Sequence, residues 1–140
     1  MRRFLLDSGI ANDFVNRRRG VVERADEERH RGNRIGTCTP VLGELLAGIG
    51  GSQSRDRNLT RLRHALSRLA LWPYDRTAAE EYGRVFAELR RIGRPMQQID
   101  IQVAAIAFSL GSTTVVSADS DLAAVPGLKV ENWATQARSG

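Results

Sequence analysis

The sequence is poor in the residues on which disulfide frameworks, zinc sites and thiol catalysis depend. Its 140 residues include one cysteine, Cys38, and two histidines, His30 and His64. A lone cysteine cannot form an internal disulfide, and the histidines lie in charged amphipathic stretches without the spacing of zinc ligands. A nucleophilic cysteine or serine would need a nearby base that the sequence does not supply. These absences exclude a disulfide scaffold and argue against zinc chemistry and covalent catalysis.

Long apolar runs are also missing. The N-terminal run Phe4-Leu5-Leu6 stops at Asp7, which is too short for a signal-peptide core, and no stretch could span a bilayer. Hydrophobic residues make up 41% of the chain and charged residues 26%, as in ordinary globular proteins. We therefore expect one folded domain over residues 1–140, located in the cytoplasm and without a membrane partner.

Lysine is almost absent, since Lys129 is the only one, yet the chain is basic, with a net charge of +5 and a pI of about 10.6. Nearly all the positive charge is arginine, whose planar fork matches phosphate oxygens. An arginine-rich basic surface is typical of nucleic-acid binders. The alternative is composition bias of a GC-rich genome, and the sequence alone leaves both explanations open.

Hydrophobic periodicity predicts strands that alternate with helices. Strands are expected at residues 3–6, 34–38, 71–74, 112–117 and 128–130. Helices are expected at residues 10–31, with a break near Gly20, and at 39–48, 54–70, 77–92 and 99–110. The hydroxyl of Thr39 and a capping box from Thr77 to Glu80 are expected to start two of these helices. The pattern indicates an α/β fold with a mostly parallel sheet covered on both faces.

Four acids stand out against this framework. In open α/β sheets, ligands bind beyond the carboxyl ends of the strands; Asp7 ends the first expected strand, and Asp119 follows the fourth. Either could instead be a helix cap or a turn residue. Glu44 lies on an uncharged helix face, and Asp100 begins an almost wholly apolar helix, where it is either a cap or a carboxylate directed along apolar surface.

A cation would explain these carboxylates, because burying an unpaired carboxylate costs many kcal/mol. The N-terminal dipole of a helix would stabilise Asp100 by only roughly 0.3 to 1 kcal/mol. Clustered carboxylates suit hard cations with oxygen ligands, which indicates magnesium or manganese. The sequence therefore predicts a divalent-metal site built from Asp7, Glu44, Asp100 and Asp119.

These acids and their flanks resemble the PIN-domain ribonucleases, specifically the VapC-type toxins of toxin–antitoxin pairs, over essentially the whole chain. The matching stretches are residues 4–8, 39–48, 100–107 and 116–119, with a family-like ending at residues 125–133. The resemblance implies a PIN-like three-layer α/β/α fold. It also implies Asp7 and Asp100 as principal Mg²⁺ ligands, with Glu44 completing the cluster and Asp119 in the fourth position, while Ser8 and Ser117 match positions where the family often places a hydroxyl.

The chain departs from the family pattern at two places. Ser8-Gly9 stands where threonine-asparagine is common, so a side-chain contact from position 9 is missing. Asp121-Leu122 comes slightly earlier than the family's aspartate-phenylalanine pair, which leaves open whether Asp119 or Asp121 supplies the fourth acid.

The resemblance implies a magnesium-dependent endoribonuclease in which metal-activated water attacks RNA and leaves a 5′-phosphate. It also implies an antitoxin partner and a homodimer. Candidate RNA contacts are Arg17, Arg18, Arg19, Arg55, Arg57, Arg61, Arg63 and Arg68, although solvated helix faces explain many of them. The alternatives are a non-catalytic PIN-like module that binds RNA or protein, and a phosphotransfer enzyme, which would usually need an aspartate where Gly9 stands.

Overall fold

A five-stranded parallel sheet forms the centre of the computed structural model, which describes residues 1–135. Residues 136–140 of the expected domain lie outside the described part of the chain. The strands are β1 (Arg3–Leu6), β2 (Arg34–Cys38), β3 (Ala70–Trp72), β4 (Thr113–Val116) and β5 (Lys129–Glu131). All five match strands expected from the sequence to within a few residues.

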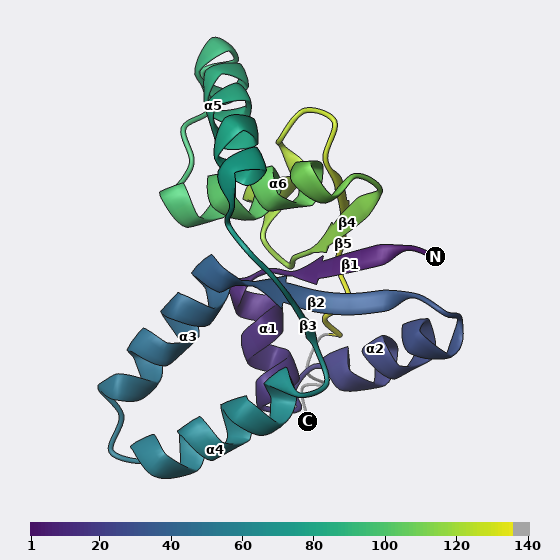
Figure 1. Ribbon diagram of the computed structural model, residues 1–140, viewed down its shortest axis with the longest axis vertical. Helices are drawn as coiled ribbons and strands as arrows, with labels where there is room; N and C mark the ends of the chain where they lie inside the picture. The colour runs from purple at the N-terminus through teal and green to yellow at the C-terminus, as the bar shows by residue number, and fades with distance from the viewer. Residues whose placement is uncertain (136–140) are drawn as a thin grey trace.

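The strand order is β3-β2-β1-β4-β5, with β1 at the centre (Figure 1). Phe4 of β1 lies opposite Ile35 of β2 on one side and Thr114 of β4 on the other. Helices cover both faces of the sheet, so the central strand is apolar throughout rather than alternating. Phe4, Leu5 and Leu6 are accordingly fully buried.

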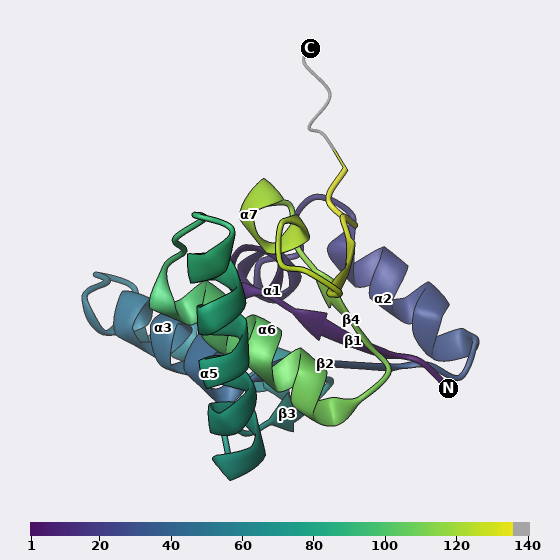
Figure 2. The same ribbon diagram turned by 90° about the horizontal axis from the view of Figure 1, so that it is seen from above.

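The helices form two layers around the sheet. They are α1 (Ser8–Val15), α2 (Val21–His30), α3 (Thr39–Gly50), α4 (Arg55–Leu66), α5 (Arg76–Arg91), α6 (Gln98–Leu110) and α7 (Ser120–Ala123). Figure 2 shows α1 and α2 on one side of the sheet and α5 and α6 on the other. The α/β/α layering expected from the sequence is thus confirmed. Within residues 1–135, no helix has both the length and the apolar character needed to cross a membrane.

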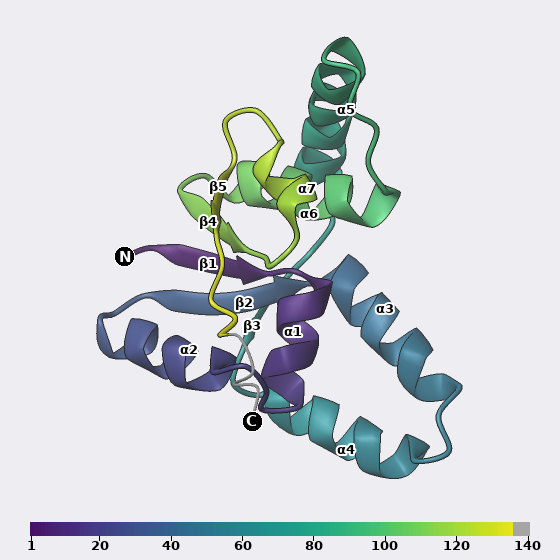
Figure 3. The same ribbon diagram turned by 180° about the vertical axis from the view of Figure 1, so that it is seen from behind.

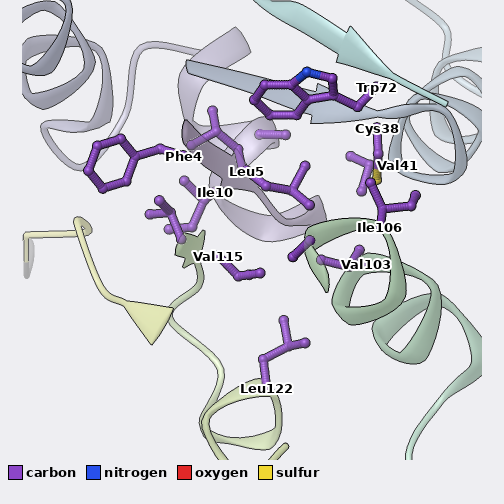
Figure 4. Close-up of a cluster of buried hydrophobic side chains, with 14 of the residues drawn as sticks. Phe4, Leu5, Ile10, Cys38, Val41, Trp72, Val103, Ile106, Val115 and Leu122 are labelled. Carbon is purple, nitrogen blue, oxygen red and sulfur yellow. The ribbon is translucent and has the colours of Figure 1, made fainter. Parts of the chain in front are cut away.

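The core joins side chains from the sheet and from both helix layers (Figure 4). Leu5 of β1 and Val115 of β4 meet Ile10 of α1 and Ile106 of α6, and all four side chains are buried. Fully burying a side chain of this size contributes about 1.5 to 3 kcal/mol. The rigid core therefore fixes where the carboxyl ends of β1 and β4 lie.

Two helix starts differ from the sequence expectation. The cap of α5 is Asp75, whose carboxylate accepts the Ala78 N–H at 3.0 Å, so the capping box predicted from Thr77 is wrong. Helix α3 has Cys38 at its cap position, and the hydroxyl of Thr39 instead accepts the Tyr74 N–H at 3.1 Å. Thr77 is displaced as a cap by Asp75, two residues earlier in the sequence, whereas the Thr39 hydroxyl is taken by a partner that only the tertiary structure reveals.

The connections of the sheet concentrate loops at one end. From β1 to β3 the chain moves along the sheet in one direction, and from β3 it crosses over to β4 and β5 on the other side of β1. Such a reversal opens a crevice beyond the carboxyl ends of the two strands that flank it. Those strands are β1 and β4, and Figure 3 shows α1, α3 and α6 meeting at this end.

Candidate metal centre and active-site cleft

A cleft of about 380 Å³ lies beyond the carboxyl ends of β1 and β4. Its walls include all four acids singled out in the sequence: Asp7, Glu44, Asp100 and Asp119. Each comes from a different place in the fold. Asp7 and Asp119 precede α1 and α7, Asp100 lies in the first turn of α6, and Glu44 lies within α3. The fold therefore gathers carboxylates that are far apart in sequence.

Asp7 is the most buried of the four, at 7% exposed. Its main-chain N–H donates to the Val116 carbonyl at 3.1 Å, and its carboxylate accepts the Ile10 N–H at 2.9 Å, which caps α1. Burial raises the pKa of Asp7 above its usual 3.8, whereas hydrogen bonds from Ser117 and Ile10 lower it, and the nearby carboxylates of Asp119 and Asp13 raise it again. Asp7 is thus a fixed carboxylate in a crowded negative environment.

Asp100 is the acid that the environment disfavours most clearly. Burial raises its pKa from 3.8 to about 6, and the charges of Asp119, Asp7, Asp121 and Glu44 act in the same direction. The cap of α6 is Gln97, and within residues 1–135 no hydrogen bond reaches the Asp100 carboxylate, so the capping alternative for Asp100 is wrong. Its charge is left for a cation or a proton to compensate.

Asp119 and Asp121 both lie close to Asp100. Among residues 1–135, one carboxylate oxygen from each of these three residues falls within 4.8 Å of the other two. Asp119 also caps α7 by accepting the Asp121 N–H at 2.9 Å, so its turn role and its place in the cleft coexist. Asp121 is paired with Arg94 at 2.9 Å, which partly neutralises it.

Glu44 lies in the cleft but is exposed. The uncharged helix face on which the sequence places Glu44 is a solvent-exposed one, because the part of α3 that follows Val41 packs only partly against the core. Glu44 remains close enough to raise the pKa values of Asp100 and Cys38. Because Glu44 is exposed, its charge carries little desolvation cost. Only its position in the cleft connects it with the other three acids.

Two serines accompany the acids. Ser117 is 2% exposed, and its hydroxyl oxygen accepts the Asp119 N–H at 3.0 Å while the hydroxyl also hydrogen-bonds to Asp7. It therefore links the Asp7 side chain to the main chain of Asp119. Ser8 lines the cleft, but among residues 1–135 its hydroxyl has no hydrogen-bond partner.

The cleft also contains residues outside the predicted acids and serines. Gln97 and Ile99 come from the start of α6, and Arg19 comes from the loop between α1 and α2. Arg19 was one of several arginines in a basic run, and no sequence signal distinguishes it from Arg17 or Arg18. The pairing of Arg94 with Asp121 joins residues 27 positions apart and has no sequence signal either.

The donor set fits a divalent cation. Carboxylate oxygens are the ligands that hard cations prefer, and here several converge without enough cationic side chains to neutralise them. Burial, and after it the charges of the neighbouring carboxylates, raises the pKa of Asp100, so both disfavour its charged form. A cation that ligates these oxygens would remove the repulsion.

Comparison with known proteins agrees with the fold and the cleft. The PIN domain family matches residues 4–128. The "tRNA(fMet)-specific endonuclease VapC" of Shigella flexneri is 33% identical over 135 residues, covering 95% of this chain and 99% of the relative. Its counterpart of the same description in Salmonella typhimurium is 30% identical over 134 residues, with 95% and 99% covered.

Solved structures give the same result. DNA-bound VapBC from Salmonella typhimurium contains a chain that superimposes with a TM-score of 0.85 at 30% identity, covering 95% of this chain and 99% of that one. VapBC2 from Rickettsia felis bound to a promoter DNA fragment gives a TM-score of 0.86 at 24% identity, covering 94% and 98%, and supports the fold alone. The chain belongs to the PIN domain family, within its VapC group.

Proposed function

We propose that this chain is a magnesium-dependent endoribonuclease and the toxin of a toxin–antitoxin pair. The observation that carries the proposal is the convergence of Asp7, Glu44, Asp100 and Asp119 on one cleft. Relatives at 30% and 33% identity are named endonucleases, and they match nearly the whole chain. The basic, arginine-rich composition suits an RNA substrate, and such a substrate places its action in the cytoplasm.

The acids of the cleft would hold the ion. Asp7 and Asp100 are its proposed principal ligands, Glu44 completes the cluster, and Asp119 takes the fourth position in preference to Asp121, which Arg94 already neutralises in part. Mg²⁺ is the expected ion, and Mn²⁺ is a substitute with the same ligand preference. When bound, the ion supplies the Lewis acidity that activates water for attack on a phosphodiester.

The chain itself prepares the site before RNA arrives. Hydrogen bonds from the Ile10 amide and Ser117 hold the Asp7 carboxylate in one orientation, so little is lost in ordering it when the ion binds. With a pKa of about 6, Asp100 carries a proton in part of the molecules near neutral pH and must release it to become a ligand. Ion binding should therefore strengthen as the pH rises through about 6.

The test compares matched aspartate-to-asparagine variants on labelled RNA. Asp7→Asn and Asp100→Asn should each lower Mg²⁺-dependent cleavage by at least about 100-fold, because loss of a ligand costs more than loss of its outer partners. Asp56→Asn, an exposed acid on α4, is the control and should cleave like the wild type.

The products decide the mechanism. Attack by water should leave 5′-phosphate and 3′-hydroxyl ends. Ends with a 2′,3′-cyclic phosphate would show that the 2′-hydroxyl of the RNA is the nucleophile, and they would refute the water-attack mechanism. Full cleavage by Asp7→Asn would refute the metal-site assignment. Retained RNA binding by the wild type, without cleavage in Mg²⁺ or Mn²⁺, would instead favour the non-catalytic PIN-like module.

The first substrate to test is tRNA(fMet). Two relatives carry that specificity in their names. Sequencing of 5′-phosphate ends after expression of this chain should show cuts enriched in tRNA(fMet). Cuts spread over messenger or ribosomal RNA would assign a different specificity, which surface shape and arginine placement would have to provide.

We also propose that the chain pairs with a cognate antitoxin and forms a homodimer. The solved relatives are VapBC complexes, one of them at 30% identity. Large apolar side chains remain exposed along α5 and beside it, including Phe86 at 48% and Ile92 at 44%. Co-purification with the protein encoded by the neighbouring gene, followed by mass measurement of the complex in solution, tests both partners. A monomer that does not bind that protein would refute both.

A further inference from the structure

One basic side chain lies among the acids of the cleft. Of the cleft-lining residues within the described chain, Arg19 alone is cationic. It belongs to the loop that connects α1 to α2. A cation at this position counters the field of the carboxylates at the place where an anionic substrate would have to approach them.

The loop holds Arg19 in an unusual backbone conformation. Its φ is +58°, in the left-handed region that residues other than glycine rarely adopt, and Arg17 has a φ of +53°. The main chain is fixed on both sides, because Arg18 N–H donates to the Asp13 carbonyl at 2.8 Å and the Arg19 carbonyl accepts the Thr135 N–H at 2.8 Å. Backbone outliers that the surrounding structure enforces are concentrated at functional sites.

The Arg19 guanidinium is held in place by one ion pair, and most of its N–H donors remain without a partner in the described chain. One of its nitrogens lies 3.6 Å from a carboxylate oxygen of Asp13, which projects from α1 and is almost buried. Within residues 1–135 the side chain makes no hydrogen bond, and 43% of it is exposed. An arginine has five N–H donors in a planar fork, so most of them stay available to a ligand in the cleft.

We propose that Arg19 binds a non-bridging oxygen of the RNA phosphate next to the metal site and stabilises the negative charge that develops there during cleavage. This inference rests on the proposed ribonuclease function. The fork of arginine matches phosphate oxygens. Arg19 lines the cleft, and the Asp13 carboxylate 3.6 Å away restrains its guanidinium. The alternative is that Arg19 serves only to pair with Asp13 and to shape the loop.

The chain offers a closely matched control for this residue. Arg17 lies two positions away, has nearly the same positive φ and the same charge, and lines a different hollow with Phe14 and His64. Arg19→Gly and Arg17→Gly therefore remove the same charge and relieve the same backbone strain. Only the first removes the cation from the acidic cleft.

Cleavage of a labelled RNA in Mg²⁺ is measured with both variants. Arg19→Gly should lower kcat by about 100-fold, the loss typical of one donor to a developing oxyanion. Arg17 is a candidate RNA contact outside the acidic cleft, so Arg17→Gly should keep its kcat, as distinct from its KM, within about fivefold of the wild type. Arg19→Gln, which keeps the aliphatic stem and a polar end but removes the guanidinium and its charge, should lose as much activity as Arg19→Gly. The salt dependence of kcat/KM should become shallower by about 0.7 in log-log slope for the lost phosphate contact.

Metal binding separates this role from a merely structural one. Removing a cation beside the acids cannot weaken their affinity for Mn²⁺, so calorimetry should give Arg19→Gly a Kd equal to the wild-type value or up to about fivefold tighter. Distortion of the loop would instead weaken both metal binding and cleavage. The inference is overturned if Arg19→Gly cleaves like Arg17→Gly, or if it loses metal affinity together with activity.

The two proposals fail in different ways. Absence of wild-type cleavage in any divalent metal would refute the ribonuclease function. Arg19 would then be judged by RNA binding in the same Mg²⁺ buffer, where Arg19→Gly should bind at least about fivefold more weakly than Arg17→Gly. Equal binding by the two variants would overturn the phosphate contact as well.

Discussion

Replacing Asp100 with asparagine should stabilise the metal-free protein at neutral pH while it abolishes activity. In the folded protein, burial and the neighbouring carboxylates raise the pKa of Asp100 to about 6 from its ordinary value of 3.8. A carboxyl with a raised pKa holds its proton more tightly in the folded state than in the unfolded state. The free energy of unfolding therefore falls as the pH rises from 3.8 through about 6, and it is lowest above that range.

The size of the effect follows from the shift. A change of about two pKa units corresponds to about 3 kcal/mol at 1.36 kcal/mol per unit. Asp100 is only partly buried, and solvent screening reduces the figure to about 1 to 2 kcal/mol. Asparagine has nearly the same shape and no charge, so Asp100→Asn should recover about that amount above pH 6 and nothing well below pH 4.

Urea unfolding in EDTA measures this difference at both pH extremes. Asp56→Asn, at an exposed position in the first turn of α4, is the control and should gain no stability at neutral pH, because the helix N-terminus favours a carboxylate there. Saturating Mg²⁺ should reverse the order of stability, since an ion at 100 times its Kd stabilises the wild type by about 2.7 kcal/mol and the variant by much less. The reasoning is refuted if Asp100→Asn destabilises the metal-free protein at neutral pH, or if its effect does not change with pH.

Three further predictions test other parts of the structure. Gly36→Ala should destabilise the protein by about 1 to 3 kcal/mol in urea unfolding, because the added Cβ would lie 2.6 Å from the Ala70 carbonyl oxygen and 2.8 Å from the Trp72 ring. An unchanged urea midpoint would contradict this packing. Cys38 should resist alkylation in the folded protein, since burial raises its pKa to about 12, and rapid labelling at mildly alkaline pH without denaturant would show the thiol to be accessible. Arg94→Gln should tighten Mn²⁺ binding by up to about fivefold in calorimetry by freeing Asp121, and weaker binding would mean that the ion pair instead supports the site.

Much of the fold could be predicted because hydrophobic periodicity is a local property. The apolar run Phe4-Leu5-Leu6 is a central strand, and the nearly all-apolar segment at residues 99–110 is a buried helix, as expected. The carboxyl-end rule then located Asp7 and Asp119 without any knowledge of side-chain positions. Their presence in one cleft follows from the reversal of strand order at β1 and β4.

Features that depend on tertiary neighbours could not be predicted. Asp75 and Thr77 are both good caps in sequence, and the helix begins one residue earlier than expected, with Asp75 as its cap. The exposure of Glu44 depends on how far α3 extends past the core, which its own sequence does not encode. The sequence does not distinguish Arg19 from its neighbours Arg17 and Arg18. What sets it apart is its position in the cleft, which depends on the tertiary structure.

The energetics of the cleft indicate why a cation belongs in it. Asp7 caps α1 and Asp100 lies in the first turn of α6, so two helix N-termini offset part of the carboxylate repulsion. Each terminus contributes only about 0.3 to 1 kcal/mol, and the pKa of Asp100 stays near 6 despite it. The fold thus holds the acids together against a repulsion that its own dipoles do not offset. Arg19 lies at the edge of that cluster, bound to Asp13 rather than to the central acids, and the central negative charge is left for an ion that arrives from solution.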